Sequence, residues 1–535
     1  MTTPAIALPS LTLSKSETDS VGLLRARLLK VAAKNEDKSR WYEAKQDPKD
    51  LGISTPAGLP EQIAAVMGWP GTIVDATEER LDFMEWVGAY AEELGRIYRA
   101  NNLSVESGRS HLDALIYGVG FVSVGAGDVA AGEPSVIVMA ESTESCTVEW
   151  DYRSRRASSA LSQTRDESGV VIMETLYLPD ETIRFEKAAG GRLAVVSRDV
   201  HKLGRVPVAR MLNRDRASDL RGRSEITRGV EYNTAAGMRT LSGLEVNREF
   251  YTSPKYTMLN VDPEVFGLDA GMSEQAKAAA KWSSTSGQMN VVPPQIDPET
   301  EERVEPKLHE FRPAPPTPYI EQVELYARLV SAESGIPIEY LGFGNGTSQS
   351  SGDSIRQHEI RLVKRVERRQ ASFDVGWMEV AKLALMMQGE FDPVRFAATG
   401  TRWRDAGTPT RAATADETTK LISVGVLDPR SKVTADRIGL SPQDQTILED
   451  ERRQATVGAL IDKIGATPDA ADGSTTAVDE ANALKAKADA LGVFIRAGVD
   501  PADAARRLGL DGIKFTGDVP VSLRVPEVDA AKLEG

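Results

Sequence analysis

Residues 342–370 (GFGNGTSQSSGDSIRQHEIRLVKRVERRQ) place a glycine-rich polar segment directly before a stretch rich in arginine. Glycine-rich loops at a helix N-terminus bind phosphate groups, because free backbone N–H groups point at the anion. Here the loop follows a predicted helix instead of a strand, it lacks the lysine of a P-loop, and no metal-binding acid stands nearby in a known pattern. Phosphate catalysis is therefore a minor hypothesis beside a plain polar surface loop.

The basic residues that follow have two interpretations. They are Arg361, Lys364, Arg365, Arg368 and Arg369. Because Glu359 and Glu367 are interspersed at helical spacing, the set fits an ordinary solvated helix face. It also fits a surface that binds an anionic partner, and the spacing alone does not decide between the two.

Other catalytic patterns are missing from the sequence. The four histidines (His111, His201, His309 and His358) form no HExxH or similar spacing, and a single cysteine, Cys146, excludes intrachain disulfides and multi-thiolate zinc sites. GVGFVSVG (118–125) follows a predicted helix and enters a strand, the reverse of a dinucleotide-binding context. We therefore predict no catalytic residue, no metal, no cofactor and no enzymatic activity.

Composition bounds the class of protein. With 535 residues, 41% hydrophobic and 27% charged, the chain is expected to form about three or four globular domains. The net charge of −15 argues against a general nucleic-acid binder, so any contact with DNA must be local, transient or enforced by shape. No segment approaches the roughly 18 apolar residues needed to cross a bilayer, and residues 1–19 do not read as a secretion signal. The expected starting compartment is the cytoplasm, with no membrane partner.

The first half of the chain predicts an α+β region. We expect a helix over 21–47 capped by Asp19 or Ser20, a short strand over Thr72–Val74 and a helix over 84–100. SGRSHLDALIYGVGFVSVG is expected to run from a helix into a strand. Period-two alternation from Phe121 to Met211 then predicts antiparallel strands between turns, in place of a βαβ repeat.

The sequence of the second half predicts two long helices that form a stalk, with a small α/β insert between them as the tip of that stalk. Residues 224–250, with Ser224 as N-cap, and residues 319–333, which end at Gly335, read as helices on either side of a small α/β insert. The longest helix, over 353–388, carries one apolar stripe: Leu362, Val366, Phe373, Trp377, Val380, Ala384 and Met387. Near the C-terminus, residues 423–441 and 496–511 echo each other, and each predicts a helix–turn–helix hairpin whose second helix starts at Asp-Pro.

The order of these parts resembles the portal proteins of tailed double-stranded-DNA bacteriophages, of the long-tailed type that infects Gram-positive hosts. The resemblance spans roughly residues 20–455, and the last 80 residues do not match. The segments that carry it are TIVDATEERL, ALIYGVGFVSV, ETLYLPDETIRF, VPVARMLNR with RGRSEITRGVEYNTAAGMRTL, SGIPIEYLGFGNGTSQSSGDSIRQHEIRLVKRVERRQASF, and KLISVGVLDP with RIGLS.

The resemblance implies a division of the chain. It would comprise an N-terminal arm (1–19), a β-rich wing (20–222 and 334–407), a two-helix stem (223–250 and 318–333), a clip (251–317), a crown (408–455) and a helical tail (456–535). The second part of the wing would hold a tunnel loop (343–352) and a long tunnel helix (353–388).

The resemblance also implies a function and a set of partners. About twelve copies would form a ring at one capsid vertex, through which DNA enters and leaves without sequence specificity. The expected partners are further copies of this chain, double-stranded DNA, the terminase large subunit, a head–tail adaptor, and the major capsid and scaffolding proteins. The location would be the virion, after assembly in the host cytoplasm. The alternatives are another capsid or connector protein and, less favoured, a soluble phosphate-handling enzyme.

In a portal, the neutral loop acquires a physical meaning. A pore that passes DNA must not grip it, and each basic residue on a phosphate adds affinity through counterion release. The loop carries hydroxyls, amides and glycines but no charge: Gly344, Asn345, Gly346, Thr347, Ser348, Gln349, Ser350 and Ser351. We therefore expect these residues to line the DNA channel, and the basic residues of 361–369 to contact a neighbouring subunit or the channel.

Overall fold

The computed structural model describes residues 12–47, 65–188, 193–217, 221–252, 255–262, 271, 273–276, 289–296, 303–311, 315–344, 352–407, 411–440, 444–453, and isolated positions between 491 and 508. The chain divides into two compact units, Met1–Thr408 and Pro409–Gly535. Across these ranges, no helix is long and apolar enough to cross a membrane.

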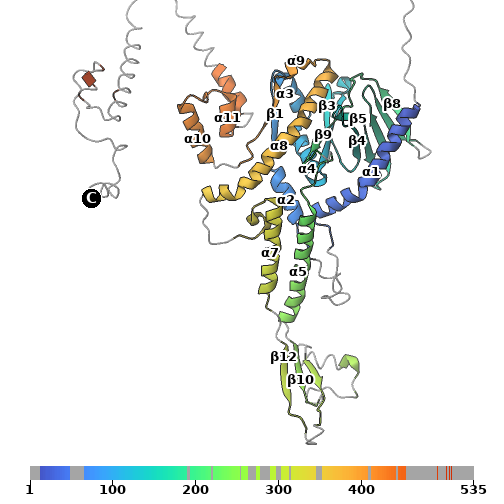
Figure 1. The fold of residues 1–535 in the computed structure, drawn as a ribbon, viewed down its shortest axis with the longest axis vertical. Coiled ribbons are helices and arrows are strands. Elements are labelled where there is room, and N and C mark those ends of the chain that lie inside the picture. Colours follow the sequence, from blue (N-terminus) through green and yellow to red (C-terminus); the bar gives the residue numbers. More distant parts are fainter. Residues whose placement is uncertain are drawn as a thin grey trace, which may run out of the picture. The chain divides into compact units, whose positions relative to one another are not determined.

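The first unit is an α+β structure, as predicted (Figure 1). Its helices are α1 (Lys15–Tyr42), α2 (Trp69–Glu78), α3 (Ala91–Ala100), α4 (Leu103–Tyr117), η1 (Val129–Ala131), α5 (Arg228–Thr252), α7 (Thr317–Ser334), η3 (Ile338–Leu341), α8 (Gly352–Gln388) and α9 (Pro393–Phe396). Its strands are β1 (Phe83–Gly88), β2 (Val119–Ala126), β3 (Val136–Glu141), β4 (Cys146–Asp151), β5 (Arg156–Arg165), β6 (Val171–Tyr177), β7 (Thr182–Lys187), β8 (Leu193–Asp199), β9 (Val208–Leu212), β10 (Lys255–Leu259), β11 (Met289–Val292), β12 (Lys307–Phe311) and β13 (Thr399–Trp403).

The strands form four small sheets. An antiparallel sheet has the order β4-β5-β6-β7-β8, and a second antiparallel sheet has the order β3-β2-β9. β1 pairs with β13, and β10 lies between β11 (parallel) and β12 (antiparallel). The predicted antiparallel region between Phe121 and Met211 is therefore confirmed. β5 was not predicted, because its sequence RASSALSQTR has few large apolar residues.

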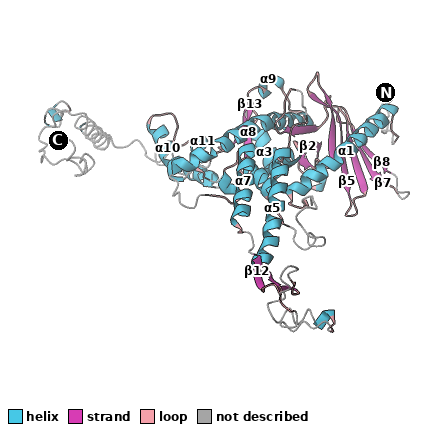
Figure 2. Cartoon of the chain, turned by 60° about the horizontal axis from the view of Figure 1, so that its bottom comes forward, coloured by secondary structure: helices cyan, strands magenta, loops and turns pink. Residues whose placement is uncertain are grey.

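Helix α1 covers the larger sheet (Figure 2). Val21, Leu24 and Leu28 of α1 are buried against apolar side chains of β5, β6 and β7, which removes apolar surface from water. The helix begins earlier than the predicted residue 21, because Ser14 and Glu17 form a reciprocal capping box: the Ser14 hydroxyl accepts the Glu17 N–H, and the Glu17 carboxylate accepts the Ser14 N–H. The prediction of Asp19 or Ser20 as the cap was wrong.

The strand predicted at Thr72–Val74 is wrong, since these residues lie within α2. Pro70 stands in the first turn, where its fixed φ favours a helix and its missing N–H costs nothing. The β-branched residues Ile73 and Val74 are 1% and 0% exposed, so their burial in the main core outweighs their local preference for a strand.

The helix predicted over 84–100 is confirmed only in its second part. Its second part is α3, but residues 83–88 form β1, whose partner β13 lies more than 300 residues away in the sequence. Gly88, at φ +94°, makes the turn out of β1, and a Cβ there would lie 2.0 Å from the Ala398 carbonyl oxygen. A strand whose partner lies this far away in the sequence has no nearby turn or second strand from which the pairing could be predicted.

The main core is built around α8. The predicted stripe is confirmed: Leu362, Val366, Phe373, Trp377, Val380 and Ala384 are all fully buried, and Met387 is partly buried against the same core. Phe83 of β1 stacks on Trp377 with ring centroids 4.7 Å apart. The Trp377 indole N–H donates to Nε2 of His111 at 2.9 Å, so the buried imidazole is neutral and acts as an acceptor.

Helices α5 and α7 lie side by side (Figure 1) and leave the core as a pair. α5 begins at Arg228, later than the predicted residue 224, and α7 ends at Gly335 as predicted. The short sheet β11-β10-β12 belongs to the insert between the two helices, as expected for the tip. Most of the helix predicted in SEQAKAAAKW and residues 297–302 of the acidic turn predicted at 297–306 lie outside the described residues.

In the second unit, α10 (Arg411–Ser423) and α11 (Lys432–Ile438) form the first predicted helix–turn–helix hairpin. The second helix starts at an N-cap on Ser431 and not at Asp428-Pro429; the Asp428 carboxylate instead accepts the Arg430 N–H within the turn. The second hairpin, at 496–511, lies mostly outside the described residues.

The buried histidine makes a test of the core. Burial lowers the pKa of His111 from 6.5 to about 3, so the unfolded chain binds a proton at moderately acidic pH that the folded chain does not. The stability that neutral His111 contributes is therefore present above pH 6.5 and is lost progressively as the pH falls toward 3. We expect His111→Phe to be less stable than the wild type at pH 7, since the Trp377 N–H loses its acceptor. That deficit should shrink by about 2 kcal/mol between pH 7 and pH 5.

Urea unfolding followed by tryptophan fluorescence at pH 7, 6 and 5 measures this difference. His309→Gln, on exposed strand β12, is the matched control and should track the wild type at each pH. A wild-type advantage over His111→Phe that stays constant with pH would show that His111 does not titrate as described.

Candidate functional site

The site predicted at the glycine-rich loop is bounded by two described elements. Gly344 is the last described residue before the loop, and Gly352 is the first residue of α8 after it. The other candidate channel residues, Asn345–Ser351, lie outside the described residues, so what the structure describes is the base of the loop.

A three-residue network joins the two sides of this base. Arg80, which follows α2, donates to the Tyr340 hydroxyl at 2.8 Å and to Glu359 Oε1 at 3.0 Å. Tyr340 in turn donates to Glu359 Oε1 at 2.7 Å, so η3 on one side of the loop is tied to α8 on the other. The Arg80 and Glu359 side chains are only 8% and 13% exposed, which protects the ion pair from solvent screening. Burial first, and then the hydrogen bond to Glu359, raises the pKa of Tyr340 and keeps it a proton donor.

The backbone that enters the loop is held by α2 as well. The Trp69 indole N–H donates to the Leu341 carbonyl at 3.2 Å, and its ring packs edge-on against Phe343 at 6.4 Å between centroids. The chain is therefore fixed within two residues of the point where the loop begins.

Two arginines of α8 cap the C-terminus of α7. The last carbonyls of a helix have no partner within it and carry partial negative charge. Arg361 donates to the Ala332 carbonyl at 2.8 Å, and Arg365 donates to the carbonyls of Glu333, at 2.7 Å, and Ser334. Gly335 follows at φ +75°, where a Cβ would lie 3.0 Å from the Arg365 guanidinium, so glycine is required for this approach.

A third arginine, Arg369, is 7% exposed and binds Glu225, which is 3% exposed and precedes α5. Asn213, after β9, donates to the same Glu225 oxygen at 3.1 Å, and Arg214 lies 3.5 Å from the other oxygen. Arg365 approaches that second oxygen at 3.9 Å. Burial first lowers the pKa of Arg365 to about 10, and the neighbouring arginines add to this, while Glu225 opposes it.

These contacts give three of the five predicted basic residues partners within one subunit. Arg361, Arg365 and Arg369 fix the ends of α7 and α5 against α8. Lys364 is exposed and pairs with Glu367 one turn away, and Arg368 is exposed.

Sequence reasoning missed the partners Glu225, Arg80 and Tyr340. No spacing rule connects a residue near 225 with one near 369, because the contact exists only in the folded chain.

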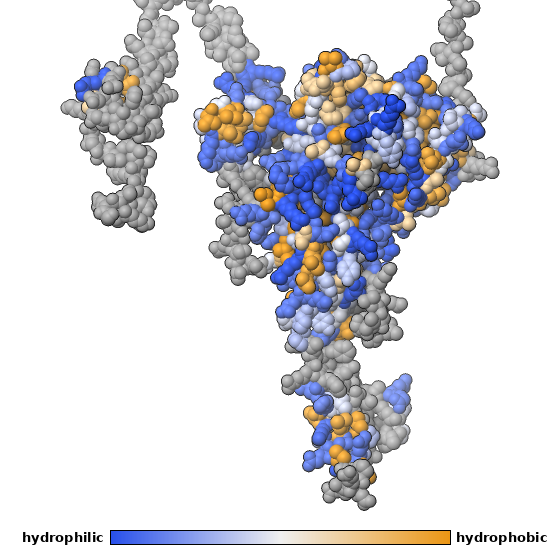
Figure 3. All heavy atoms as spheres, viewed as in Figure 1, coloured by the Kyte–Doolittle hydropathy of each residue, from blue (hydrophilic) through white to orange (hydrophobic). Residues whose placement is uncertain are grey.

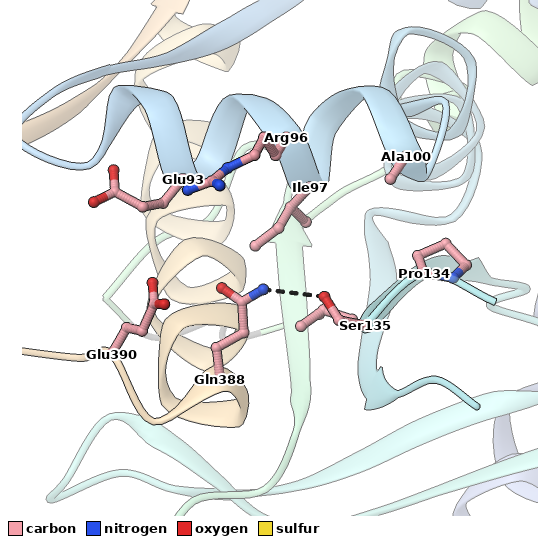
Figure 4. Close-up of a pocket in the computed structure, with 9 residues that line it drawn as sticks. Glu93, Arg96, Ile97, Ala100, Pro134, Ser135, Gln388 and Glu390 are labelled. Carbon is pink, nitrogen blue, oxygen red and sulfur yellow. Dashed lines mark hydrogen bonds between the residues drawn. The ribbon is translucent and has the colours of Figure 1, made fainter. Parts of the chain in front are cut away.

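A separate hollow of about 230 Å³ lies where α3, the start of β3 and the end of α8 meet (Figure 4). The Gln388 amide donates to the Ser135 hydroxyl across it at 3.2 Å. Glu93 and Arg96 of α3 line one wall, and Glu390 lies on the other side. Glu93 already forms an ion pair with Arg395. This carboxylate in the wall of the hollow therefore has a partner within the subunit.

Within the described ranges, no group of three or more histidine, cysteine or acidic side chains could hold a metal ion. Cys146 is buried, and burial raises the pKa of its thiol well above the ordinary value, so it is an inert core residue as expected. The interactions at the loop base hold helices in position, which defines a structural subunit.

Comparisons with known proteins place this subunit in a family. Residues 65–433 match the family model described as Phage portal protein, SPP1 Gp6-like. The chain is 30% identical to the portal protein of Mycobacterium phage D29 over 438 residues, covering 79% of this chain and 87% of that protein. It is also 30% identical to the portal protein of Mycobacterium phage L5 over 442 residues, covering 80% and 87%.

Solved structures give weaker similarity. A chain in the virion of a native gene transfer agent particle matches with a TM-score of 0.38 and 12% identity, covering 76% of this chain and 94% of that one. A chain in the neck of the native particle, computed with C12 symmetry, matches with a TM-score of 0.36 and 13% identity, covering 70% and 89%.

The chain belongs to the SPP1 Gp6-like family of phage portal proteins. The resemblance seen in the sequence is confirmed, and so is the expected function of a bacteriophage portal protein, which forms the DNA channel at the capsid vertex. Family membership implies a structural role in the virion.

The buried ion pair makes a test of the site. Glu225→Gln keeps the shape of the side chain but leaves Arg369 buried without a counter-charge, and breaking a buried pair costs about 3–5 kcal/mol. We expect the variant to unfold at lower urea concentration, with a loss of stability in that range.

The double variant Lys364→Gln, Glu367→Gln is the control on the same helix. It removes an exposed pair, for which a loss below about 1 kcal/mol is expected. Equal losses in the two variants would mean that Glu225 has no special role.

Proposed function

We propose that about twelve copies of this chain form a ring at one capsid vertex and that double-stranded DNA passes through its centre during packaging and ejection. The assignment of residues follows the family resemblance: wing 20–222 and 334–407, stem 223–250 and 318–333, clip 251–317, crown 408–455, and tail 456–535. The loop 343–352 of each copy lines the channel.

The observation that carries the channel role is a neutral loop on a fixed base. Residues 344–351 have no charged side chain, although the 18 residues from Arg361 to Met378 include five basic ones. Arg80, Tyr340 and Glu359 tie both sides of the loop together, so the loop projects from a defined place. Hydroxyls and amides exchange hydrogen bonds with phosphates or water, whereas lysines would add salt-dependent affinity and slow DNA translocation.

The basic residues of α8 divide into two roles under this proposal. Arg361, Arg365 and Arg369 act within the subunit, where they hold the stem helices against α8. Lys364 and Arg368 remain exposed, and we assign them to a neighbouring subunit, since a fixed basic collar on the channel would retard DNA.

The stem supports ring formation through apolar surface. Val323, Ala327 and Val330 of α7 are buried within the subunit, while Leu325 and Leu329 on the other side of the helix are 50% and 46% exposed. Figure 3 shows apolar side chains at the surface of the helix pair. In a closed ring each subunit presents two different surfaces to its two neighbours, and this face would be covered by one of them.

The remaining partners follow from the same assignment. The terminase large subunit would dock on the clip during packaging, and a head–tail adaptor would take its place afterwards. The wing would contact the major capsid and scaffolding proteins during assembly in the host cytoplasm.

Replacing Ser348, Gln349 and Ser350 with lysine tests the channel loop. We expect intact rings but several-fold slower DNA packaging in a defined in vitro system, with the defect reduced by added salt, because the new contacts are electrostatic. The control replaces the same three residues with asparagine, which preserves neutrality and should leave the rate unchanged. Wild-type packaging rates with the three lysines would contradict a channel position for the loop.

Replacing Leu325 and Leu329 with glutamate tests the stem contact. We expect folded subunits that no longer form rings in negative-stain images, since burying the charges at the interface is costly. Val394→Glu, at a position that is 84% exposed on α9, is the control and should assemble normally. Normal rings from the double variant would place the subunit contact elsewhere.

A further inference from the structure

One hollow of the first unit is strongly basic, although the chain as a whole is acidic. A cavity of about 600 Å³ lies between β4, β5, β9 and α8. We call it the basic groove; its charged lining is Arg155, Arg156, Arg205, Arg210, Arg216, Asp215 and Glu379. Five arginines therefore face two acids in a chain with 64 basic and 79 acidic residues. Such a concentration of charge marks a place for an anionic partner.

Two of these arginines already have partners within the subunit. Arg205 pairs with Glu379 at 3.1 Å, and Arg210 stacks on the Trp150 ring at 3.2 Å. Arg155, Arg156 and Arg216, by contrast, are exposed on the groove wall. Lys382 lies one turn further along α8. Its pKa is lowered first by burial and then by repulsion from the positive charges of Arg205 and Arg156. An anion bound in the groove would offset the repulsion between these positive charges.

An opposite patch lies at the end of α2. We call it the acidic ridge, and it consists of Asp75, Glu78, Glu79 and Asp82. Asp75, Glu79 and Asp82 are exposed, and Arg404 compensates only one charge, through Asp82 at 2.7 Å. Burial first, and then the three neighbouring acids, raise the pKa of Glu78. The ridge carries crowded negative charge, as the groove carries crowded positive charge.

The two patches lie on opposite flanks of α8. Glu379 lines the basic groove, whereas Gln370 donates to the carbonyl of Arg404, whose guanidinium binds Asp82 of the ridge. Nine residues separate Gln370 from Glu379, which is about two and a half helical turns, so their side chains leave α8 in opposite directions. A subunit with complementary patches on opposite flanks can bind a copy of itself head to tail, which is the contact that generates rings.

We propose that the acidic ridge of one subunit occupies the basic groove of the next, which adds a charged contact in the wing to the ring. This inference rests on the proposed ring. The ring could also form without this contact, through other surfaces of the subunit. Arginines bind carboxylates with paired hydrogen bonds, and carboxylate side chains are small enough to enter the hollow between Trp150 and Val375. A DNA duplex is a convex rod, whose phosphates would reach only the groove rim.

Charge exchange tests the pairing. Glu79→Arg and the double variant Arg156→Glu, Arg216→Glu each place like charges at the contact. We expect each to lower the fraction of subunits in rings at moderate salt by about tenfold, because like charges then face each other at every contact of the ring. Combining the three substitutions in one chain should restore assembly. Glu167→Arg and Lys187→Glu change exposed charges away from both patches and are the controls.

Cross-linking tests adjacency directly. Subunits with Glu79→Cys and subunits with Arg156→Cys are mixed, assembled and treated with a short bis-maleimide; the native Cys146 is buried. We expect cross-linked dimers in mixed rings and almost none in rings made from either variant alone.

The outcomes separate the two proposals. Absence of rings from wild-type chain under all assembly conditions would refute the ring itself. Normal rings from both charge reversals, without mixed dimers, would refute the ridge-in-groove contact and leave the ring intact. Normal rings that lose packaged DNA only with Arg156→Glu, Arg216→Glu would also refute it, by assigning the groove to DNA.

Discussion

The ion pair between Glu225 and Arg369 is the interaction on which the arrangement of the subunit depends. It is nearly inaccessible to solvent, and it joins the chain before α5 to the middle of the core helix α8. A buried pair is costly to form, so it persists only where further hydrogen bonds satisfy both groups. Asn213 supplies one to Glu225, and the Arg365 carbonyl accepts another from Arg369. The end of β9, the chain before α5 and the middle of α8 are thereby held around one carboxylate, although α8 lies 144 residues further along the sequence.

The same cluster explains why the arginines of α8 follow so closely on the loop. Arg361 and Arg365 reach the C-terminus of α7, while Arg369 reaches Glu225 at the entrance to α5. Helix α7 and the chain that enters α5 are thus bound to one face of α8, and Thr227, just before α5, donates to Glu333 of α7 at 2.7 Å.

The sequence allowed the helical stripe of α8, the antiparallel strands, the end of α7 and the family to be predicted, because each depends on local periodicity or on the order of local segments. It did not allow α2, β1 or β13 to be predicted. Ile73 and Val74 prefer a strand locally and become helical through burial, and β1 finds its partner 300 residues later. The candidate site was located by composition, but its partners Arg80, Tyr340 and Glu225 depend on tertiary contacts that no spacing encodes.

The division of charge along residues 344–379 has a consequence for a channel in an acidic protein. Negative net charge keeps the surface from adsorbing DNA, but a ring of acidic subunits repels itself unless opposite charges meet at the contacts. Under the two proposals, arginines that act within the subunit and in a groove between subunits would satisfy both requirements, since those cations would neutralise protein carboxylates and be withheld from phosphates. In the proposed channel, the uncharged loop would then be the part of this segment that touches DNA, because weak, exchangeable hydrogen bonds hold a moving duplex less than fixed charges do.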